Sequence, residues 1–422
     1  MLIGIDASRA NRSHKSGTEW YSYYIIRELA KLDKDNQYIL YTDKPLTCGL
    51  SNLATDISEE SEPVFKDNCQ LIKSPHNNFK AKVLRWPFKF FWTQGRLSLE
   101  MLFKAPDVLF VPAHALPIIH PKKSVVTIHD IGFKREEKLY ERSNIGATRN
   151  SYQSVIDFLV RLLTLGKYGA NTFDYLDWST KFALKKAQAI ITISEFTKQE
   201  LEALYKIDKT KIKVIYNGYP QEIYKPVVNK IEAERVLSSY GIKQPYIFYV
   251  GRLEKKKNIA TLIEAFYILK AHHSDLPHKL YLVGDASFGF DDIKYSIHGF
   301  GLQDQVVATG WVKELDLPYI FACASAFVFP SNYEGFGIPL LQAMAAGIPI
   351  AASRAASIPE VVGDAAILFN QSDSADLAKA LASILSDDDL RQQLISAGQK
   401  RVANYSWTKC ATETLDFIKS LV

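Results

Sequence analysis

The sequence predicts an α/β protein made of two Rossmann-like, doubly wound domains that face each other across a cleft. Three observations favour this fold class. The chain has 422 residues, more than one hydrophobic core usually serves. Short apolar runs alternate with helical patterns, as in repeated βαβ units. Most of these runs are continuously apolar, which is typical of parallel strands buried on both faces.

The predicted strands are short and rich in aliphatic and aromatic residues. In the first half they are LIGIDAS (2–8), QYILYT (37–42), VLFVPAH (108–114), SVVTIHD (124–130), AIITIS (189–194) and IKVIYNG (212–218). In the second half they are PYIFYVG (245–251), KLYLVG (279–284), VVATG (306–310), AFVFPS (326–331) and IPIAAS (348–353). Helical patterns separate them, for example at 18–32, 258–273 and 374–385.

The alternation stops in a polar stretch with two prolines, and we interpret 219–232 as a linker. The expected domains are therefore residues 1–220 and residues 233–405, followed by a final segment, 406–422. Ligands of such folds bind at the carboxyl ends of the strands.

The composition and charge favour some classes of protein over others. Hydrophobic residues make up 47% and charged residues 23%, as in soluble globular proteins. The net charge of +5 does not indicate a nucleic-acid partner. The 4 cysteines lack metal-ligand or redox spacing, and the first residues form a strand pattern without a signal peptide. Reduced thiols and the lack of a long apolar run favour a cytoplasmic location.

Two segments of the first domain interrupt the βαβ pattern. Residues 80–104 interleave Lys and Arg with Trp and Phe, and residues 151–178 begin with an amphipathic stretch. Both patterns suit peripheral contact with a membrane or with a lipid-linked partner. The alternative is that their apolar faces pack on the core of the domain.

The stretch SNYEGFGIP (331–339) indicates a ligand site in the second domain. Glu334 follows a buried strand, and the nearby glycines allow close approach of the backbone to a ligand. Pro339 is suited to a first helical turn, whose free N–H groups would attract an anion. A carboxylate beside an anion site favours a ligand with both hydroxyl and phosphate groups. The alternative is that Glu334 caps the helix and the glycines only shape a turn.

A second motif, YVGRLEKKKN (249–258), follows the first strand of this domain. Gly251 and Arg252 end the strand, and Asn258 is the expected N-cap of the next helix. Arg and Lys together suit a diphosphate that gains charge as it leaves. Of the lysines between them, we expect 255 and 256 to be ordinary surface residues.

In the first domain, VVTIHDIGF (125–133) places His129 at the end of a buried strand. A histidine at a strand end is more often structural, but this one would face the cleft. The loop 6–24 carries Gly17 before a helix, as a phosphate- or acceptor-facing loop would.

Together these motifs resemble the retaining glycosyltransferases of family 4, which have the GT-B fold. The resemblance spans nearly the whole chain and is strongest in the second domain. It implies that residues 1–220 bind an acceptor and residues 233–405 bind a nucleotide-sugar. It also implies that 406–422 form a helix that returns to the first domain. It rests on the order of seven motifs: GTEWYSYYIIREL, TIHDIGF, AIITISEFTKQEL, VIYNG, VGRLEKKKN, EGFGIPLLQAMAAGIPI and SIPEVVGDAAILF.

The resemblance implies roles for individual residues. Arg252 and Lys257 would grip the donor diphosphate, and Glu334 would contact the hydroxyls of the donor sugar. His129 would approach that sugar from the first domain. These four would be the catalytic residues. The expected donor-binding residues are Gly17, Gly251, Gly310, Val312, Gly335, Phe336, Gly337 and Gln342.

The sequence departs from the family at position 342. The family usually has a second glutamate there that reaches the nucleotide ribose, whereas this chain has Gln342. An amide oxygen can still accept from one ribose hydroxyl, but the amide nitrogen can only donate. The change puts nucleotide affinity or preference in question and leaves the fold unaffected.

The resemblance implies transfer of a hexosyl unit from GDP-mannose or a UDP-hexose to a glycan or lipid-linked acceptor, in the synthesis of a surface polysaccharide. No cofactor is expected. The pair Asp33 and Asp35 does not follow a strand, so no metal is expected either. Other open functions are a nucleotide-sugar epimerase, a sugar-phosphate synthase or a non-catalytic nucleotide-sugar-binding protein. An NAD-dependent oxidoreductase is disfavoured because no G-x-G-x-x-G follows the first strand.

Overall fold

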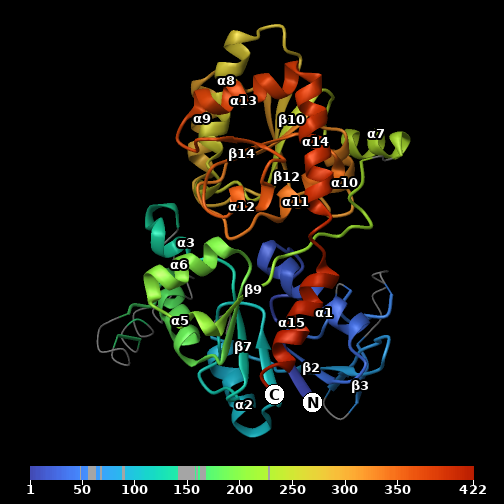
Figure 1. The fold of residues 1–422 in the computed structure, drawn as a ribbon, viewed down its shortest axis with the longest axis vertical. Coiled ribbons are helices and arrows are strands. Elements are labelled where there is room, and N and C mark those ends of the chain that lie inside the picture. Colours follow the sequence, from blue (N-terminus) through green and yellow to red (C-terminus); the bar gives the residue numbers. More distant parts are fainter. Residues whose placement is uncertain are drawn as a thin grey trace. The chain divides into compact units, whose positions relative to one another are not determined.

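The computed structural model describes the chain apart from residues 48, 56–62, 67–68, 88–90, 141–156, 158–159, 162–167 and 227–228. The chain forms two compact units (Figure 1). Unit 1 consists of Met1–Arg135, Glu141–Asn217 and Trp407–Val422. Unit 2 consists of Glu136–Tyr140 and Gly218–Ser406.

Unit 1 is built on a sheet in the order β3-β4-β5-β2-β1-β6-β7-β8-β9. Its strands are β1 (Leu2–Asp6), β2 (Gln37–Thr42), β3 (Phe65–Lys66), β4 (Cys69–Leu71), β5 (Phe79–Val83), β6 (Val108–Val111), β7 (Ser124–Ile128), β8 (Ala189–Thr192) and β9 (Ile212–Val214). In the spatial order β5-β2-β1-β6-β7-β8-β9, each neighbouring pair is parallel. Parallel pairing is what the apolar runs predicted for all of these strands except β5, which was not predicted. Strand β4 is antiparallel to both of its neighbours, so the expectation of a purely parallel sheet is wrong at this edge.

Strands β3, β4 and β5 at this side of the sheet were not predicted from the sequence, for a physical reason. Strand β5 reads FKAKV, and Ala81 is buried while Lys80 is exposed. One face of this strand therefore lies against the core and the other is solvated. An alternating pattern of only five residues inside a basic segment gives no continuous apolar run.

Helices accompany the sheet of unit 1. They are α1 (Gly17–Leu32), α2 (Ser98–Lys104), α3 (Gly132–Arg135), α5 (Thr172–Lys186), α6 (Glu195–Tyr205) and α15 (Trp407–Lys419). Although α15 ends the chain, it lies beside α1 (Figure 1, red beside blue). The rings of Tyr24 and Trp407 stack with centroids 5.2 Å apart, and Thr408 Oγ1 donates to Glu28 at 2.8 Å.

Unit 2 contains a sheet in the order β12-β11-β10-β13-β14-β15, and each neighbouring pair is parallel. Its strands are β10 (Tyr246–Val250), β11 (Lys279–Val283), β12 (Val306–Gly310), β13 (Ala326–Phe329), β14 (Ile350–Ser353) and β15 (Ile367–Phe369). The last of these was not predicted as a strand. Its three residues lie inside the SIPEVVGDAAILF motif, too short a run to stand out.

Both faces of this sheet are covered, which explains its continuously apolar strands. Ile247 and Tyr249 of β10 join a core with Leu262 and Leu381 from the helices on one face. Phe248 points the other way, with its ring centroid 4.9 Å from that of Phe321. The helices are α7 (Lys230–Ser239), α8 (Ile259–His272), α9 (Phe290–Gly299), α10 (Leu317–Ala322), α11 (Ile338–Ala346), α12 (Ile358–Val362), α13 (Ser374–Ser386) and α14 (Asp388–Val402).

Two details complete the comparison with the predictions. Helix α7 begins at Lys230, so the end of the predicted linker 219–232 is helical. Most of the amphipathic stretch at the start of 151–178 lies outside the described residues, whereas its end belongs to α5. Among the helices that the structure describes, none is long and apolar enough to cross a bilayer.

Candidate functional site

The candidate site lies where the sheet of unit 2 changes its winding direction. From β10 the chain proceeds outward through β11 to β12, whereas β13, β14 and β15 lie in sequence on the other side of β10. The loops that follow β10 and β13 are therefore neighbours at the carboxyl edge of the sheet, which is where ligands bind in such folds. A backbone hydrogen bond of 2.9 Å from Asn332 N to Lys256 O joins these two loops.

The two loops bring Lys257 and Glu334 together. Lys257 Nζ lies 2.5 Å from Glu334 Oε1, and the two side chains are only 15% and 12% exposed. Ser331 Oγ donates to the same carboxylate oxygen at 2.7 Å. The main-chain oxygen of Glu334 accepts from Ser357 Oγ at 2.9 Å, which fixes the loop itself. The carboxylate and the ammonium are thus held in place at the carboxyl edge of the sheet.

Arg252 stands beside this pair on the loop after β10. Its side chain is 56% exposed, and Nη2 lies 3.6 Å from Glu254 Oε2. Lys256 Nζ lies 3.5 Å from the other oxygen of Glu254, and the side chain of Lys256 is only 15% exposed. The expectation that Lys256 is an ordinary surface residue is therefore wrong, because it is held against a largely buried carboxylate. Lys255 is exposed, as expected.

Asn258 occupies the predicted N-cap position of α8 but does not cap that helix. Its backbone is left-handed, with φ of 57°, and its side chain makes no capping hydrogen bond. Instead Nδ2 donates to Pro330 O at 3.2 Å and to Gln371 O at 2.8 Å. The side chain therefore ties the end of β13 and the loop after β15 to the loop that carries Lys257.

Helix α11 starts directly after the glutamate loop. Gly337 is its N-cap with φ of 100°, a conformation that favours glycine, and Pro339 lies in the first turn. The first N–H groups of the helix are thus directed toward the Glu334 loop, where they can attract an anion. Phe336 is buried, with its ring edge toward Tyr405 at a centroid distance of 5.8 Å, so Phe336 anchors the loop and Gly335 lies beside it.

Gln342 follows one turn into α11 and is only 7% exposed. Among the residues that the structure describes, its side chain has no hydrogen-bond partner. The fully buried polar side-chain atoms that lack a partner in the described part of the chain do not include those of Gln342, so its amide keeps some contact with solvent. This polar group is therefore available for a ligand.

Three further predicted residues end strands of the same sheet. Gly251 follows β10 with φ of 147°, and its N–H donates to Val283 O at 2.9 Å. Gly310 ends β12 with φ of 74°, and its carbonyl accepts from Gly284 N at 2.9 Å. Val312 is buried, so this position can offer a ligand backbone atoms but little of its side chain.

In unit 1, His129 comes directly after β7 and is only 6% exposed. Its Nε2–H donates to Pro112 O at 3.0 Å, and its ring meets the edge of Tyr21 at 4.9 Å. Burial, together with the nearby His114, lowers the pKa of His129 to about 4. The imidazole is therefore neutral at physiological pH, and its Nε2–H is engaged with Pro112 O.

Gly17 opens α1 in the same unit. A side chain at this position would meet no atom within 4 Å, so the glycine leaves open space beside the helix start. The preceding Ser16 and Glu19 form a capping box, in which Glu19 accepts from Ser16 N at 3.2 Å. Arg9 reaches the same glutamate at 3.4 Å and is largely exposed.

Sequence reasoning overlooked three supporting residues in unit 2. Ser331 and Glu254 hold Glu334, Arg252 and Lys256, and Ser357 holds the backbone of the Glu334 loop. A serine or a glutamate in a loop carries no distinctive sequence signal. The partner of Ser357 is also distant in sequence, whereas those of Ser331 and Glu254 lie two or three positions away.

Comparison with known proteins covers most of the chain. The family described as Glycosyltransferase Family 4 matches residues 15–222, and the family described as Glycosyl transferases group 1 matches residues 233–401. An O-antigen chain mannosyltransferase B of Escherichia coli is 29% identical over 336 residues, covering 78% of this chain and 84% of the relative.

Solved structures share the fold at low sequence identity. A sucrose-phosphate synthase from Thermosynechococcus elongatus is 17% identical, with a TM-score of 0.70 over 100% of this chain and 99% of that one. The Anabaena protein HepE in complex with UDP-glucose is also 17% identical, with a TM-score of 0.67 over 99% of both chains.

Proposed function

The chain belongs to the glycosyltransferases of family 4 and has their GT-B fold, and we propose that it is a retaining, metal-independent hexosyltransferase. It would move a hexosyl unit from a nucleoside-diphosphate sugar to a glycan or lipid-linked acceptor. Unit 2 would bind the donor, and unit 1 would bind the acceptor.

The observation that carries this proposal is the Lys257–Glu334 pair at the winding reversal of the sheet. A diphosphate needs cations and N–H donors, whereas sugar hydroxyls need a carboxylate. In support, Lys257 contacts the carboxylate of Glu334, Arg252 belongs to the same loop as Lys257, and α11 starts directly after the loop of Glu334. This combination suits a ligand that carries both chemical groups.

The chemistry follows from that arrangement. The bond between the anomeric carbon and the diphosphate oxygen breaks, and the acceptor oxygen forms a new bond to the same face of the carbon. The leaving phosphate oxygen takes the acceptor proton. Arg252, Lys257 and the helix dipole stabilise the charge that develops on the diphosphate, which is commonly the largest catalytic effect. Glu334 orients the sugar through its hydroxyls.

We favour a mannosyl donor with a guanosine base. The support is the similarity to an O-antigen chain mannosyltransferase B of Escherichia coli, which also favours a role in the synthesis of a surface polysaccharide. UDP-hexoses are the alternative donors, since HepE was solved with UDP-glucose. An epimerase or a sugar-phosphate synthase on the same fold would give different products.

A two-stage experiment tests the proposal. Thermal unfolding with GDP-, UDP- and dTDP-sugars identifies the donor, because a ligand of the folded state raises its stability by mass action. The purified protein with that donor and a lipid-linked glycan acceptor should then form a glycoside of unchanged anomeric configuration, also in EDTA. An inverted product, a free epimer, a sugar phosphate as the main product or loss of activity in EDTA would contradict it.

A further inference from the structure

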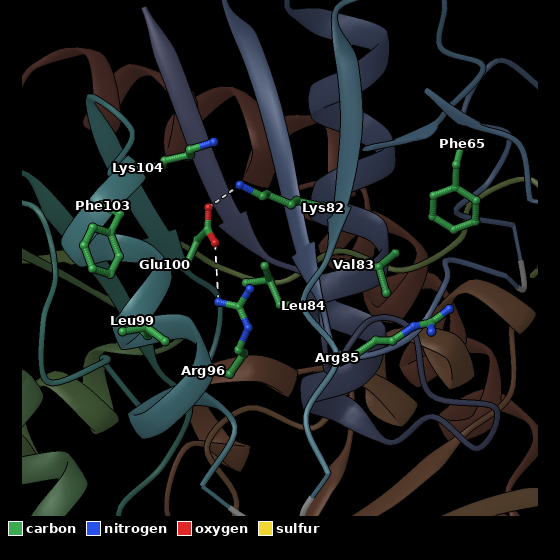
Figure 2. Close-up of a pocket in the computed structure, with 10 residues that line it drawn as sticks. All are labelled: Phe65, Lys82, Val83, Leu84, Arg85, Arg96, Leu99, Glu100, Phe103 and Lys104. Atoms are coloured by element: carbon green, nitrogen blue, oxygen red, sulfur yellow. Dashed lines mark hydrogen bonds and ion pairs between the residues drawn. The ribbon is translucent and has the colours of Figure 1, made fainter. Parts of the chain in front are cut away.

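A cavity lies in unit 1, away from the candidate site residues. It has a volume of about 950 Å³ and opens between β5 and α2 (Figure 2). Four basic residues line it, namely Lys82, Arg85, Arg96 and Lys104. Glu100 is the single acidic residue in its lining. The cavity therefore carries a clear excess of positive charge.

The internal ion pairs of the cavity use two of these cations. Glu100, with a side chain only 8% exposed, is contacted by Lys82 Nζ and by Arg96 Nη1, the latter at 3.4 Å (Figure 2). Arg85 and Lys104 are both exposed, and neither has an ion-pair partner within the described part of the chain. Two exposed cations of the cavity lining are thus available for external anions.

Apolar side chains stand next to these cations. On α2, Glu100 and Met101 are buried, while Leu102 is 56% and Phe103 is 75% exposed. Across the cavity, Phe65 of β3 is 48% exposed. Large apolar residues that cluster on an exposed surface commonly mark a contact with a protein or a membrane.

We propose that this surface, formed by Phe65, Arg85, Leu102, Phe103 and Lys104 and called here the α2 surface, docks on an anionic lipid bilayer. Arg85 and Lys104, on opposite sides of the cavity (Figure 2), each attract an anionic headgroup, and Leu102 and Phe103 enter the boundary between headgroups and acyl chains. Basic residues attract anionic lipids, and aromatic and leucine side chains favour this boundary.

The juxtaposition of the two kinds of side chain selects a bilayer over other anions. A free phosphate or a nucleic acid would use the cations and would leave Leu102 and Phe103 exposed to water. The inference rests on the proposed function only in that a lipid-linked acceptor would bring the enzyme to a membrane. Vesicle binding requires no donor and no turnover, so it can fail while glycosyl transfer succeeds, and the reverse also holds.

Flotation of the full chain with vesicles tests the proposal. We compare phosphatidylcholine vesicles with vesicles containing 30 mol% phosphatidylglycerol, roughly the anionic content at which surface charge attracts basic segments. The charge variant is Arg85→Glu/Lys104→Glu, and the insertion variant is Leu102→Ser/Phe103→Ser. The matched control is Lys185→Glu/Lys186→Glu, which changes the net charge equally on exposed lysines of α5.

We expect the wild type and the control to float with anionic vesicles only. The charge variant should bind at least about tenfold more weakly, and the insertion variant several-fold more weakly, with unchanged thermal unfolding midpoints. Equal losses in the control and the charge variant would reduce the effect to net charge and overturn the proposal. So would full binding by the insertion variant, or no binding by the wild type at low salt.

Discussion

Lys257 and Glu334, which are 77 positions apart in the sequence, form a 2.5 Å ion pair at the carboxyl edge of the unit 2 sheet. Each side chain is largely buried, so each depends on the other for compensation of its charge. A donor that binds here would replace this mutual contact with contacts to phosphate and to sugar hydroxyls. The pair therefore holds both groups in position before the ligand arrives.

Removal of Lys257 should impair both stability and transfer. Lys257→Ala leaves the carboxylate of Glu334 largely buried with Ser331 as its one remaining side-chain partner among the described residues, so the thermal midpoint should fall. Arg252→Ala removes an exposed side chain and should leave the midpoint nearly unchanged. Each variant should lose about 2–4 kcal/mol of transition-state stabilisation, measured as kcat/KM on the true donor.

Lys255→Ala is the matched control for these two variants. It removes an exposed lysine from the same loop and should change kcat/KM by less than about twofold. Equal effects of Lys255→Ala and Lys257→Ala would show that the diphosphate does not bind at this position.

Gln342→Glu should separate ligand affinity from stability. The side chain is almost fully buried, so a carboxylate there should lower the unfolding midpoint of the ligand-free protein. A carboxylate could accept from two ribose hydroxyls, and the affinity for the nucleoside diphosphate should rise roughly tenfold. Calorimetric titration and thermal unfolding of both proteins measure the two effects.

Gln342→Leu serves as the control of similar size. It removes both polar groups and should weaken nucleotide binding while it preserves the fold. Unchanged affinity in both variants would mean that position 342 does not face the nucleotide, and weaker binding by Gln342→Glu would rule out the simple ribose contact.

Glu314 should make the stability of the chain depend on pH. Burial raises its pKa to about 7, and Tyr224 donates to it at 3.3 Å. Because the folded state retains the proton longer than the unfolded state, the free energy of unfolding should fall as the pH rises from about 4.5 to about 7, then level off. Glu314→Gln should stabilise the protein by roughly 1–3 kcal/mol at pH 8 and have little effect near pH 4.5. Urea unfolding at both pH values measures this, and equal effects would refute it.

His129 should make the stability of the chain depend on pH in the opposite direction, with lower stability at lower pH. Its pKa of about 4 lies below the ordinary value, so protonation favours the unfolded state. Its contribution to stability should be complete above about pH 6.5 and decline as the pH falls toward 4. An NMR titration of its ring protons should give a midpoint near 4. A midpoint near 6.5 would mean that the ring is solvated and free of the Pro112 contact.

The predictions failed where a side chain binds residues distant in sequence, or where the local sequence is typical of a different structure. Asn258 looked like a helix cap by its position, but its side chain is bonded to residues 72 and 113 positions away. The sequence could not indicate that Lys256 is enclosed, because a run of three lysines usually marks a solvated loop. Strands β3 and β4 are too short and too polar to be distinguished from loop.

The sequence by itself determined the architecture of the two units, because strands buried on both faces must be continuously apolar and helices must carry apolar residues at regular spacing. It also indicated that Glu334 and Gly337 lie between a strand and a helix, since those positions depend on local signals. Only the tertiary structure decided which loops became neighbours. Strand order brought β10 beside β13, and this pairing joined Lys257 to Glu334. Such contacts depend on the winding of a whole sheet, which no local stretch of sequence encodes.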